Sequence, residues 1–341
     1  MSVADDPRLL IWGAGAIGGT IGAYLARAGE DVLLVDTVAA HVAACAGPGL
    51  EVVGPVEEFR QVVPAVTPDG VVGRFDRVVL AVKAQHTAAA VAALAPHVAD
   101  DGYVVSAQNG LNELEIAEAV GARRTMGAFV NFGADWLEPG KILYGNRGAV
   151  VVGEVDRTVR DRTQALHRLM QKFEPDAVLT DDIFAYLWGK LGYGALLFGT
   201  ALTPDSMAQN FADPARTDIF VALGREVMAV ALARDVSPKG FNGFEPDAFM
   251  PGASEAAARA CIAALAEFNS KTAKTHTGIY RDLAVRKRKT EVDQQVGAVV
   301  RLGAEAGIAT PYMARLQALI HDIEDGRREM SAETFFALAE G

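Results

Sequence analysis

The chain has 341 residues, half of them apolar, and a formal net charge of −11. This length suffices for two domains with separate cores, and the acidic balance argues against a nucleic-acid surface, which needs clustered Lys and Arg. The two cysteines, Cys45 and Cys261, lie far apart and indicate neither a disulfide framework nor a zinc site. No apolar run has the length of a membrane span, and the acidic N-terminus lacks a secretion-signal core. We therefore expect a cytoplasmic protein that binds neither nucleic acid, membrane nor metal.

A glycine fingerprint follows the first predicted strand, residues 9–12. Gly13, Gly15 and Gly18 have the spacing G-x-G-x-x-G, and an apolar, alanine-rich helix follows them. Gly13 permits a tight turn, Gly15 lets a pyrophosphate approach the backbone, and Gly18 lets helix and strand pack closely. The alternative is an ordinary βαβ unit whose glycines serve packing alone. The predicted cofactor contacts, which use the N–H groups of the helix start, are Gly13, Gly15, Ala16, Ile17 and Gly18.

An acidic residue ends the second predicted strand, residues 32–35. Asp36 lies 18 residues after Gly18, where a ribose-binding carboxylate belongs. Such a carboxylate accepts hydrogen bonds from the ribose hydroxyls of NAD and repels the additional phosphate of NADP. Neither Thr37 nor Val38 could pair that phosphate. The sequence favours NAD(H), and NADP(H) stays open if an Arg folds in from elsewhere.

Strands and helices alternate up to about residue 152, with strands over 77–82, 103–106 and 125–130 and late antiparallel strands around 144–145 and 149–152. This alternation predicts a mostly parallel, doubly wound Rossmann-type sheet. Ligands bind over the carboxyl ends of such strands, where Lys83 and Asn109 lie. We expect both to bind cofactor and substrate. The alternatives are a solvated cation at Lys83 and an Asn-Gly turn at Asn109.

Strand alternation ends near residue 180, and mostly helical segments follow it. Residues 1–180 are therefore predicted to form the dinucleotide-binding domain, and residues 181–341 an all-helical substrate and catalytic domain. The expected helices cover residues 87–94 in the first domain and 182–201, 214–234, 254–269, 291–307, 311–323 and 331–339 in the second.

Lys190 lies within an apolar, glycine-rich helical segment. Burial disfavours the charged ammonium and lowers its pKa toward the range in which it donates a proton near neutral pH. The alternative is a lysine whose stem covers apolar surface while its charge reaches water.

Further along, Thr290 can cap the helix expected from Glu291, and the basic run 286–289 is typical of a solvated face, although it could also meet cofactor phosphates. His276 is more typical of a surface or core histidine than of a catalyst.

Together these segments resemble the ketopantoate reductase (2-dehydropantoate 2-reductase) family across almost the whole chain. The resemblance is carried, in order, by Gly13–Gly18, Val82-Lys83-Ala84, Gln108-Asn109-Gly110, Trp188-Gly189-Lys190-Leu191, Arg281-Asp282, Thr290 to Gly297, and Gly307 to Pro311.

The resemblance implies a reductase of pantothenate biosynthesis in which hydride passes from a reduced nicotinamide to the ketone carbon of a 2-oxo acid. Lys190 would be the general acid, Lys83 and Asn109 would line the nicotinamide and substrate crevice, and Glu291 would reach cofactor or substrate. Stabilisation of the developing alkoxide by an ammonium fits this role.

The chain departs from that family at its substrate contacts. The family's asparagines one and two turns after the lysine correspond to Gly194 and Phe198, which suggests a bulkier or less polar substrate. The family's substrate-binding serine falls near Thr277, beside His276. The family mostly prefers NADPH, whereas Asp36 favours NADH.

Two other functions remain open. The chain could be an NAD-dependent dehydrogenase of another hydroxy acid or an imine-type substrate, or a dinucleotide sensor without turnover. A homodimer is also expected. The predicted substrate contacts are Lys83, Asn109, Lys190, Gly194, Phe198, His276 and Thr277, and the catalytic residues are Lys190 and Glu291.

Overall fold

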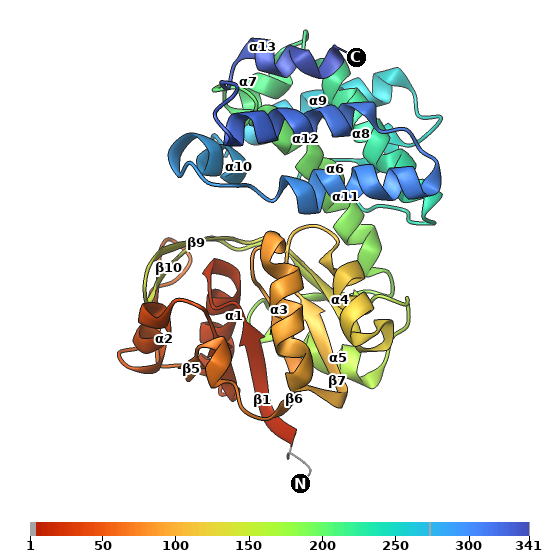
Figure 1. Cartoon of the computed structure of the whole chain (residues 1–341). Coiled ribbons are helices and arrows are strands. Elements are labelled where there is room, and N and C mark those ends of the chain that lie inside the picture. The colour runs from red at the N-terminus through yellow and green to blue at the C-terminus, as the bar shows by residue number, and fades with distance from the viewer. Residues whose placement is uncertain (1–4, 273, 341) are drawn as a thin grey trace. The chain divides into compact units, whose positions relative to one another are not determined.

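A computed structural model describes residues 5–272 and 274–340 (Figure 1). Residues 1–4, part of the N-terminus expected to lack a secretion signal, lie outside that description. The chain divides into two compact units, Met1–Ile183 and Phe184–Gly341. The assignment of cofactor binding to one unit and substrate chemistry to the other stays a prediction.

The first unit is built on an eight-stranded sheet with the order β12-β11-β8-β7-β6-β1-β2-β5. All neighbouring strands pair in parallel except β8 and β11, which are antiparallel. The predicted parallel sheet is thereby confirmed. The strands are β1 (Asp5–Trp12), β2 (Val32–Val35), β5 (Ala65–Val66), β6 (Arg74–Leu80), β7 (Val98–Ser106), β8 (Thr125–Val130), β11 (Val150–Glu154) and β12 (Val178–Leu179).

Apolar side chains cover both faces of this sheet. In β1, Leu9 and Ile11 join one core, while Leu10 and Trp12 join the other. Because alternate residues of a strand point to opposite faces, a strand buried on both sides needs a continuous apolar run. The first core includes residues of α1 (Ala16–Arg27) and α5 (Asp161–Gln171), and the second includes residues of α3 (Thr87–Leu94) and α4 (Asn112–Val120), which lie together on one face in Figure 1.

A second, four-stranded sheet with the order β4-β3-β10-β9 belongs to the same unit. Its strand β10 pairs antiparallel with β9 and parallel with β3. It packs on α1, where a Cβ at Gly19 would lie 2.5 Å from Cδ1 of Ile142. The strands are β3 (Leu50–Val53), β4 (Phe59–Gln61), β9 (Gly133–Glu138) and β10 (Lys141–Asn146), and α2 (Ala39–Ala46) precedes β3.

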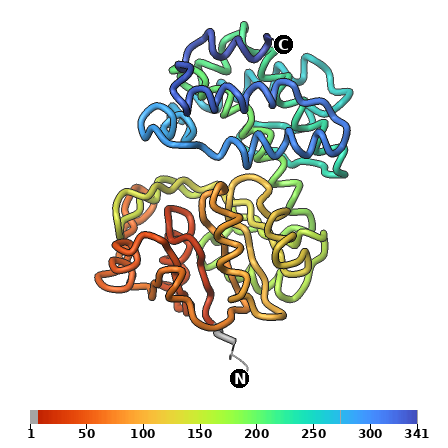
Figure 2. The backbone as a smooth tube through the Cα atoms, viewed as in Figure 1, coloured from red at the N-terminus to blue at the C-terminus, as the bar shows by residue number. Residues whose placement is uncertain are grey.

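The second unit is helical, as Figure 2 shows for the green-to-blue part of the chain. Its helices are α6 (Ile183–Thr200), α7 (Met207–Ala212), α8 (Thr217–Ala233), α9 (Glu255–Ser270), α10 (Gly278–Tyr280), α11 (Val292–Ala306), α12 (Pro311–Glu324) and α13 (Ala332–Phe336). Within the described residues, no helix is long and apolar enough to cross a membrane.

The start of α11 differs from the expectation. The N-cap residue is Glu291, and the helix begins at Val292. The hydroxyl of Thr290 accepts a 3.3 Å hydrogen bond from the N–H of Val292, but it also donates to Oε1 of Glu324 at 2.7 Å. Thr290 therefore ties the start of α11 to α12.

Candidate active site

The three fingerprint glycines differ in what surrounds them. A Cβ at Gly13, where φ is +100°, would lie 2.7 Å from the backbone N of Val82, and a Cβ at Gly18 would lie 2.0 Å from the backbone O of Gly13. Both positions are closed to any side chain. Apart from its own chain neighbours and the backbone of its helix, a Cβ at Gly15 would meet no atom of the described residues within 4 Å. The backbone at Gly15 is thus open to a ligand, as phosphate binding by this loop requires.

Gly15 is also the N-cap of α1. The first turn of α1 contains no acidic residue, and in the part of the chain that the structure describes no side chain caps it. The first N–H groups of a helix have no partner within the helix and carry a partial positive charge. Gly15, Ala16 and Ile17 are partly exposed. This helix start can therefore hold an anion.

Asp36 lies directly after β2 and contacts the glycine loop. Its Oδ2 accepts a 3.1 Å hydrogen bond from the N–H of Ala14, and its Oδ1 accepts one of 2.9 Å from Val38. Each carboxylate oxygen can accept more than one hydrogen bond. Asp36 is only partly buried, so it can bind a ribose hydroxyl while it holds the loop.

His41 of α2 is a loop contact that sequence reasoning missed. It is 1% exposed, with Nε2 2.8 Å from the backbone O of Ala14 and Nδ1 accepting from the N–H of Gly140 at 2.9 Å. Because Nδ1 accepts a hydrogen bond, the ring is neutral and Nε2 donates. The N–H of Trp136 also points at Nδ1, at 3.4 Å. The role of His41 in holding the glycine loop follows from contacts with Ala14 and Gly140, which are distant in sequence and leave no local pattern.

Lys83 and Asn109 follow the neighbouring strands β6 and β7. Lys83 is exposed and begins a short 3-10 turn, three residues beyond the end of β6, and Asn109 is partly buried. In the order β7-β6-β1-β2, the carboxyl ends place Asn109, Lys83, the glycine loop and Asp36 in one row. Neighbouring strands are about 4.8 Å apart, so the row extends about 14 Å. An extended dinucleotide bound across strand ends needs such a row.

A buried network joins the segments that carry Lys83 and Asn109. Nε2 of Gln108 donates to the backbone O of Val82 at 2.9 Å and to the hydroxyl of Thr87 at 2.8 Å. That hydroxyl donates to Oδ1 of Asn112, whose Nδ2 donates to the backbone O of Asn109 at 2.7 Å. Gln108 thus fixes both strand ends. The signal in the sequence was a polar residue two positions after a buried strand.

In the second unit, α6 presents one partly exposed face. Tyr186, Lys190, Gly194 and Leu197 share it, and residues on either side of it are mostly buried. Spacings of three and four residues put side chains on one helical face. Phe198, the other expected substrate contact, is fully buried. A ligand would reach Phe198 only if its ring moved, whereas Gly194 is open to contact.

The glycines of α6 have different roles. A Cβ at Gly189 would lie 1.9 Å from the backbone O of Lys239, and one at Gly192 would lie 2.7 Å from Cε of Met228. Those two glycines let other segments approach the helix. A Cβ at Gly194 would meet only Oε1 of Gln295, at 3.4 Å, which is an ordinary contact. Packing therefore explains Gly189 and Gly192 and leaves Gly194 unexplained.

Glu291, His276 and Thr277 lie elsewhere in the second unit. Glu291 is 8% exposed and occupies the N-cap position of α11 without a capping bond from its side chain, and Gln295, one turn later, donates its N–H to the backbone O of Glu291 at 3.1 Å. The hydroxyl of Thr277 accepts from the N–H of Tyr280 at 2.9 Å and caps α10. Nε2 of His276 lies 3.0 Å from the backbone O of Pro204, and its ring contacts the ring of Tyr280 in a tilted arrangement with the centroids 4.2 Å apart. Local structure thus accounts for Thr277 and His276.

The basic run 286–289 is largely ion-paired. Arg286 and Arg288 contact Oδ1 of Asp282 at 3.0 and 2.8 Å, and Nζ of Lys289 lies 3.6 Å from Oε2 of Glu324 and contacts Asp325. Asp282 is 5% exposed, and it holds two of these cations against the turn that precedes α11. These pairs favour the interpretation of the run as a structural, partly solvated face.

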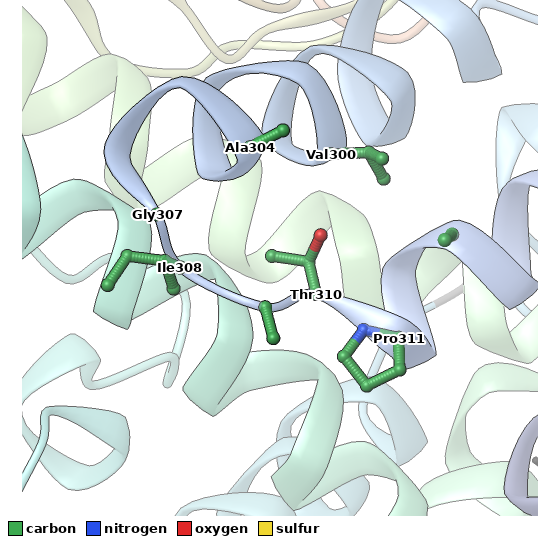
Figure 3. A pocket seen from close by; sticks show the side chains of 8 residues that line it. Val300, Ala304, Gly307, Ile308, Thr310 and Pro311 are labelled. Atoms are coloured by element: carbon green, nitrogen blue, oxygen red, sulfur yellow. The ribbon is translucent and has the colours of Figure 1, made fainter.

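A hollow of about 550 Å³ lies where α11 leads into α12 (Figure 3). Its lining is almost entirely apolar and includes none of the predicted site residues. The lining residues are Val300, Ala304, Gly307, Ile308, Ala309, Thr310, Pro311 and Ala314. Within the described residues, no cluster of three His, Cys, Asp or Glu side chains could hold a metal ion.

Comparison with known proteins adds the family context. The sequence profile of the family described as ketopantoate reductase PanE/ApbA matches residues 9–157, and that of its C-terminal domain matches residues 182–324. A 2-dehydropantoate 2-reductase from Mesorhizobium japonicum is 29% identical over 336 residues, covering 92% of this chain and 96% of that protein.

Two solved structures share the fold over 94% of this chain and 99% of theirs. D-mandelate dehydrogenase, described with NADH and anilino(oxo)acetate, has a TM-score of 0.80 at 23% identity. A PanE/ApbA family ketopantoate reductase from Ralstonia eutropha JMP134 has a TM-score of 0.77 at 25% identity.

Proposed function

This chain belongs to the ketopantoate reductase PanE/ApbA family, and from that premise we propose that it is an NADH-dependent reductase of a 2-oxo acid. The observation that carries the proposal is the row of Asp36, the open glycine loop, Lys83 and Asn109 along one sheet edge. The helix start can hold the pyrophosphate, and Asp36 can bind the ribose next to it. When bound, the reduced nicotinamide supplies the hydride.

Lys190 is the proposed general acid. As hydride adds to the carbonyl carbon, the carbonyl π bond breaks and negative charge grows on the oxygen. Nζ of Lys190 gives that oxygen a proton, which yields the 2-hydroxy acid and a neutral amine that regains a proton from water. An ammonium already positioned at the developing charge lowers the barrier without reorganisation. Lys83, Asn109 and Glu291 are the proposed binding groups around the reacting centre.

The preference for NADH is proposed from Asp36. Its carboxylate is held by two backbone N–H groups at the end of β2, so it cannot turn away from a ribose bound there without the loss of both bonds. The phosphate of NADPH would meet this negative charge at close range.

The proposed substrate is a 2-oxo acid with a side chain larger or less polar than that of ketopantoate. Gly194 lies one turn after Lys190 and offers no polar side chain, while Leu197 shares its face. Both features favour apolar groups beside the reacting carbon. Phenylglyoxylate, the oxo form of mandelate, is a suitable test compound together with ketopantoate and pyruvate.

NADH consumption, followed by its absorbance, tests the proposal with these three acids. We expect turnover of at least one, and Lys190→Ala should lower kcat about a hundredfold or more. The matched control is Lys271→Ala, which alters an exposed lysine whose one ion pair among the described residues is with Glu267, and it should leave kcat unchanged. Full kcat in Lys190→Ala would contradict the role of Lys190.

The alternatives give different results in the same assays. A dehydrogenase that acts mainly in oxidation would show a higher kcat/KM for a 2-hydroxy acid with NAD than for the oxo acid with NADH. A sensor would bind NADH without turnover of any acid in either direction. The proposed homodimer is tested by light scattering, in which a mass near 36.0 kDa would contradict it.

A further inference from the structure

Gly194 of α6 and Gln295 of α11 face each other within the second unit. Oε1 of Gln295 lies 3.4 Å from the place where a Cβ at Gly194 would stand, and apart from the neighbouring backbone of α6 no other atom of the described residues lies within 4 Å of that place. The carboxamide therefore borders a space that a glycine leaves open. Lys190 lies one turn earlier on the same face of α6, at a separation of about 5–6 Å between Cβ positions.

The carboxamide of Gln295 is available for a ligand. Gln295 is partly exposed, and its side chain makes no hydrogen bond with any of the described residues. Other glutamines are engaged: Nε2 of Gln317 donates to Asp293 at 2.6 Å, and Gln108 makes the buried bonds described above. The backbone of Gln295 is fixed in the first turns of α11 by its bond to Glu291.

We propose that the Gln295 carboxamide binds the carboxylate of the 2-oxo acid and thereby determines how the substrate lies beside Lys190. This inference rests on the proposed function. A carboxamide N–H donates to a carboxylate oxygen in a charge-assisted hydrogen bond, which is stronger than a bond between neutral groups.

The chemistry of a 2-oxo acid suits this pair of groups. Its carboxylate is bonded directly to the carbonyl carbon, so the two polar ends of the reacting unit lie close together. An ammonium at the carbonyl oxygen and a carboxamide at the carboxylate, about one helical turn apart, can contact both ends at once. Gly194 adds no side chain between them. Gln295 is thus a positioning residue for the substrate, and Lys190 carries the proton.

The test uses the whole chain with saturating NADH. The substrate is whichever of phenylglyoxylate, ketopantoate and pyruvate gives the wild-type protein its highest kcat/KM. In Gln295→Leu, which removes the hydrogen bond and keeps a similar size, KM should rise about tenfold or more while kcat changes less. In Gln295→Glu, KM should rise further, because a carboxylate would face the substrate carboxylate. Gln295→Asn, which keeps a carboxamide, should recover part of the loss.

Gln294→Leu is the matched control. Gln294 is the preceding residue of the same helix and is partly exposed like Gln295, but it points about 100° away around the helix axis. The KM of the Gln294→Leu variant should stay at the wild-type value. The affinity for NADH, measured by fluorescence, should be unchanged in every variant. If Gln295→Leu fails to fold, Gln295→Glu still tests the proposal, because its side chain is polar and has the same size as that of Gln295.

The outcomes separate the two proposals. Unchanged KM in Gln295→Leu or Gln295→Glu, with an active wild-type protein, would overturn the role of Gln295 and leave the proposed function intact. An equal rise of KM in Gln294→Leu would also overturn that role, since a general disturbance of α11 would then explain the effect. A wild-type protein that turns over no 2-oxo acid would overturn the proposed function and this inference with it.

Discussion

Nε2 of His41 donates a hydrogen bond to the backbone oxygen of Ala14 over 2.8 Å, while Oδ2 of Asp36 accepts from the N–H of the same residue. Ala14 lies between the two glycines of the loop that is proposed to bind the pyrophosphate. Both of its backbone polar groups are thus held by side chains. Such fixed geometry lowers the cost of ordering the loop when a ligand binds.

Replacement of His41 should weaken NADH binding. His41→Phe removes the bonds to Ala14 and Gly140 and leaves two buried backbone groups without them, which should cost about 1–3 kcal/mol of stability. The Kd for NADH should rise about tenfold, as measured by fluorescence titration. His167→Phe is the control, because His167 also contacts a backbone oxygen, that of Ala177, but lies away from the loop. Equal weakening in both variants would contradict a specific role.

Loss of the Asp36 charge should shift cofactor preference. Asp36→Asn keeps the size and one acceptor oxygen but removes the repulsion of a 2′-phosphate. The ratio of kcat/KM for NADPH to that for NADH should rise about tenfold or more, since close contact between like charges costs on the order of 1 kcal/mol or more. Initial rates with each cofactor measure the ratio. A wild-type preference for NADPH would contradict the prediction.

Two glycines of α6 should respond in opposite ways to alanine. Gly189→Ala should lower the free energy of unfolding by about 1–3 kcal/mol, because its Cβ would lie 1.9 Å from the backbone oxygen of Lys239. Gly194→Ala should leave stability unchanged or raise it by up to about 1 kcal/mol, because alanine favours a helix and the site is open. Urea denaturation measures the free energy of unfolding of the two variants. An equal decrease in both would contradict the distinction between the two glycines.

The Glu30 ion pairs should make part of the stability depend on pH. Nζ of Lys172 hydrogen-bonds Glu30 at 2.5 Å and lowers the pKa of that carboxyl group, and Arg77 adds to this effect. Because the folded pKa lies below the unfolded one, the contribution is present above the unfolded pKa and is lost as pH falls through the folded pKa.

Glu30→Gln should therefore reduce the free energy of unfolding by less than about 1 kcal/mol at pH 7, and the difference from the wild type should shrink as the pH falls below about 4. Urea denaturation at both pH values measures it. Glu58→Gln is the control, since Glu58 is exposed and has no ion pair among the described residues. A loss independent of pH would show that the ion pairs do not cause it.

The thiol of Cys45, whose Sγ lies 3.6 Å from Nε2 of His41, should be unreactive in the folded protein. Burial, with a smaller effect of the Asp36 charge, raises the pKa of Cys45 to about 12, and burial also raises that of Cys261. Since the thiolate is the reactive form, neither cysteine should react with a disulfide reagent at pH 7 until the protein unfolds. Absorbance of the released thiolate measures this, and rapid reaction of the native protein would contradict it.

The sequence by itself determined the elements and the positions on them. Glycine spacing, the acid at Asp36 and the alternation of apolar runs gave the parallel sheet and the loop, because each is a local pattern fixed by backbone geometry. Spacing at the helical period likewise placed Lys190 and Gly194 on one face of α6. The long second-unit helices were predicted to within a few residues.

The tertiary structure alone decided which side chains support those positions. His41 holds Ala14, Gln108 joins two strand ends, and Gln295 borders Gly194. The partners in each pair are far apart in sequence, and Phe198, on the same helix as Gly194, is instead buried in the core. A periodic pattern specifies the face of an element on which a residue lies. The partner across that face depends on strand order and helix packing, which no local pattern records.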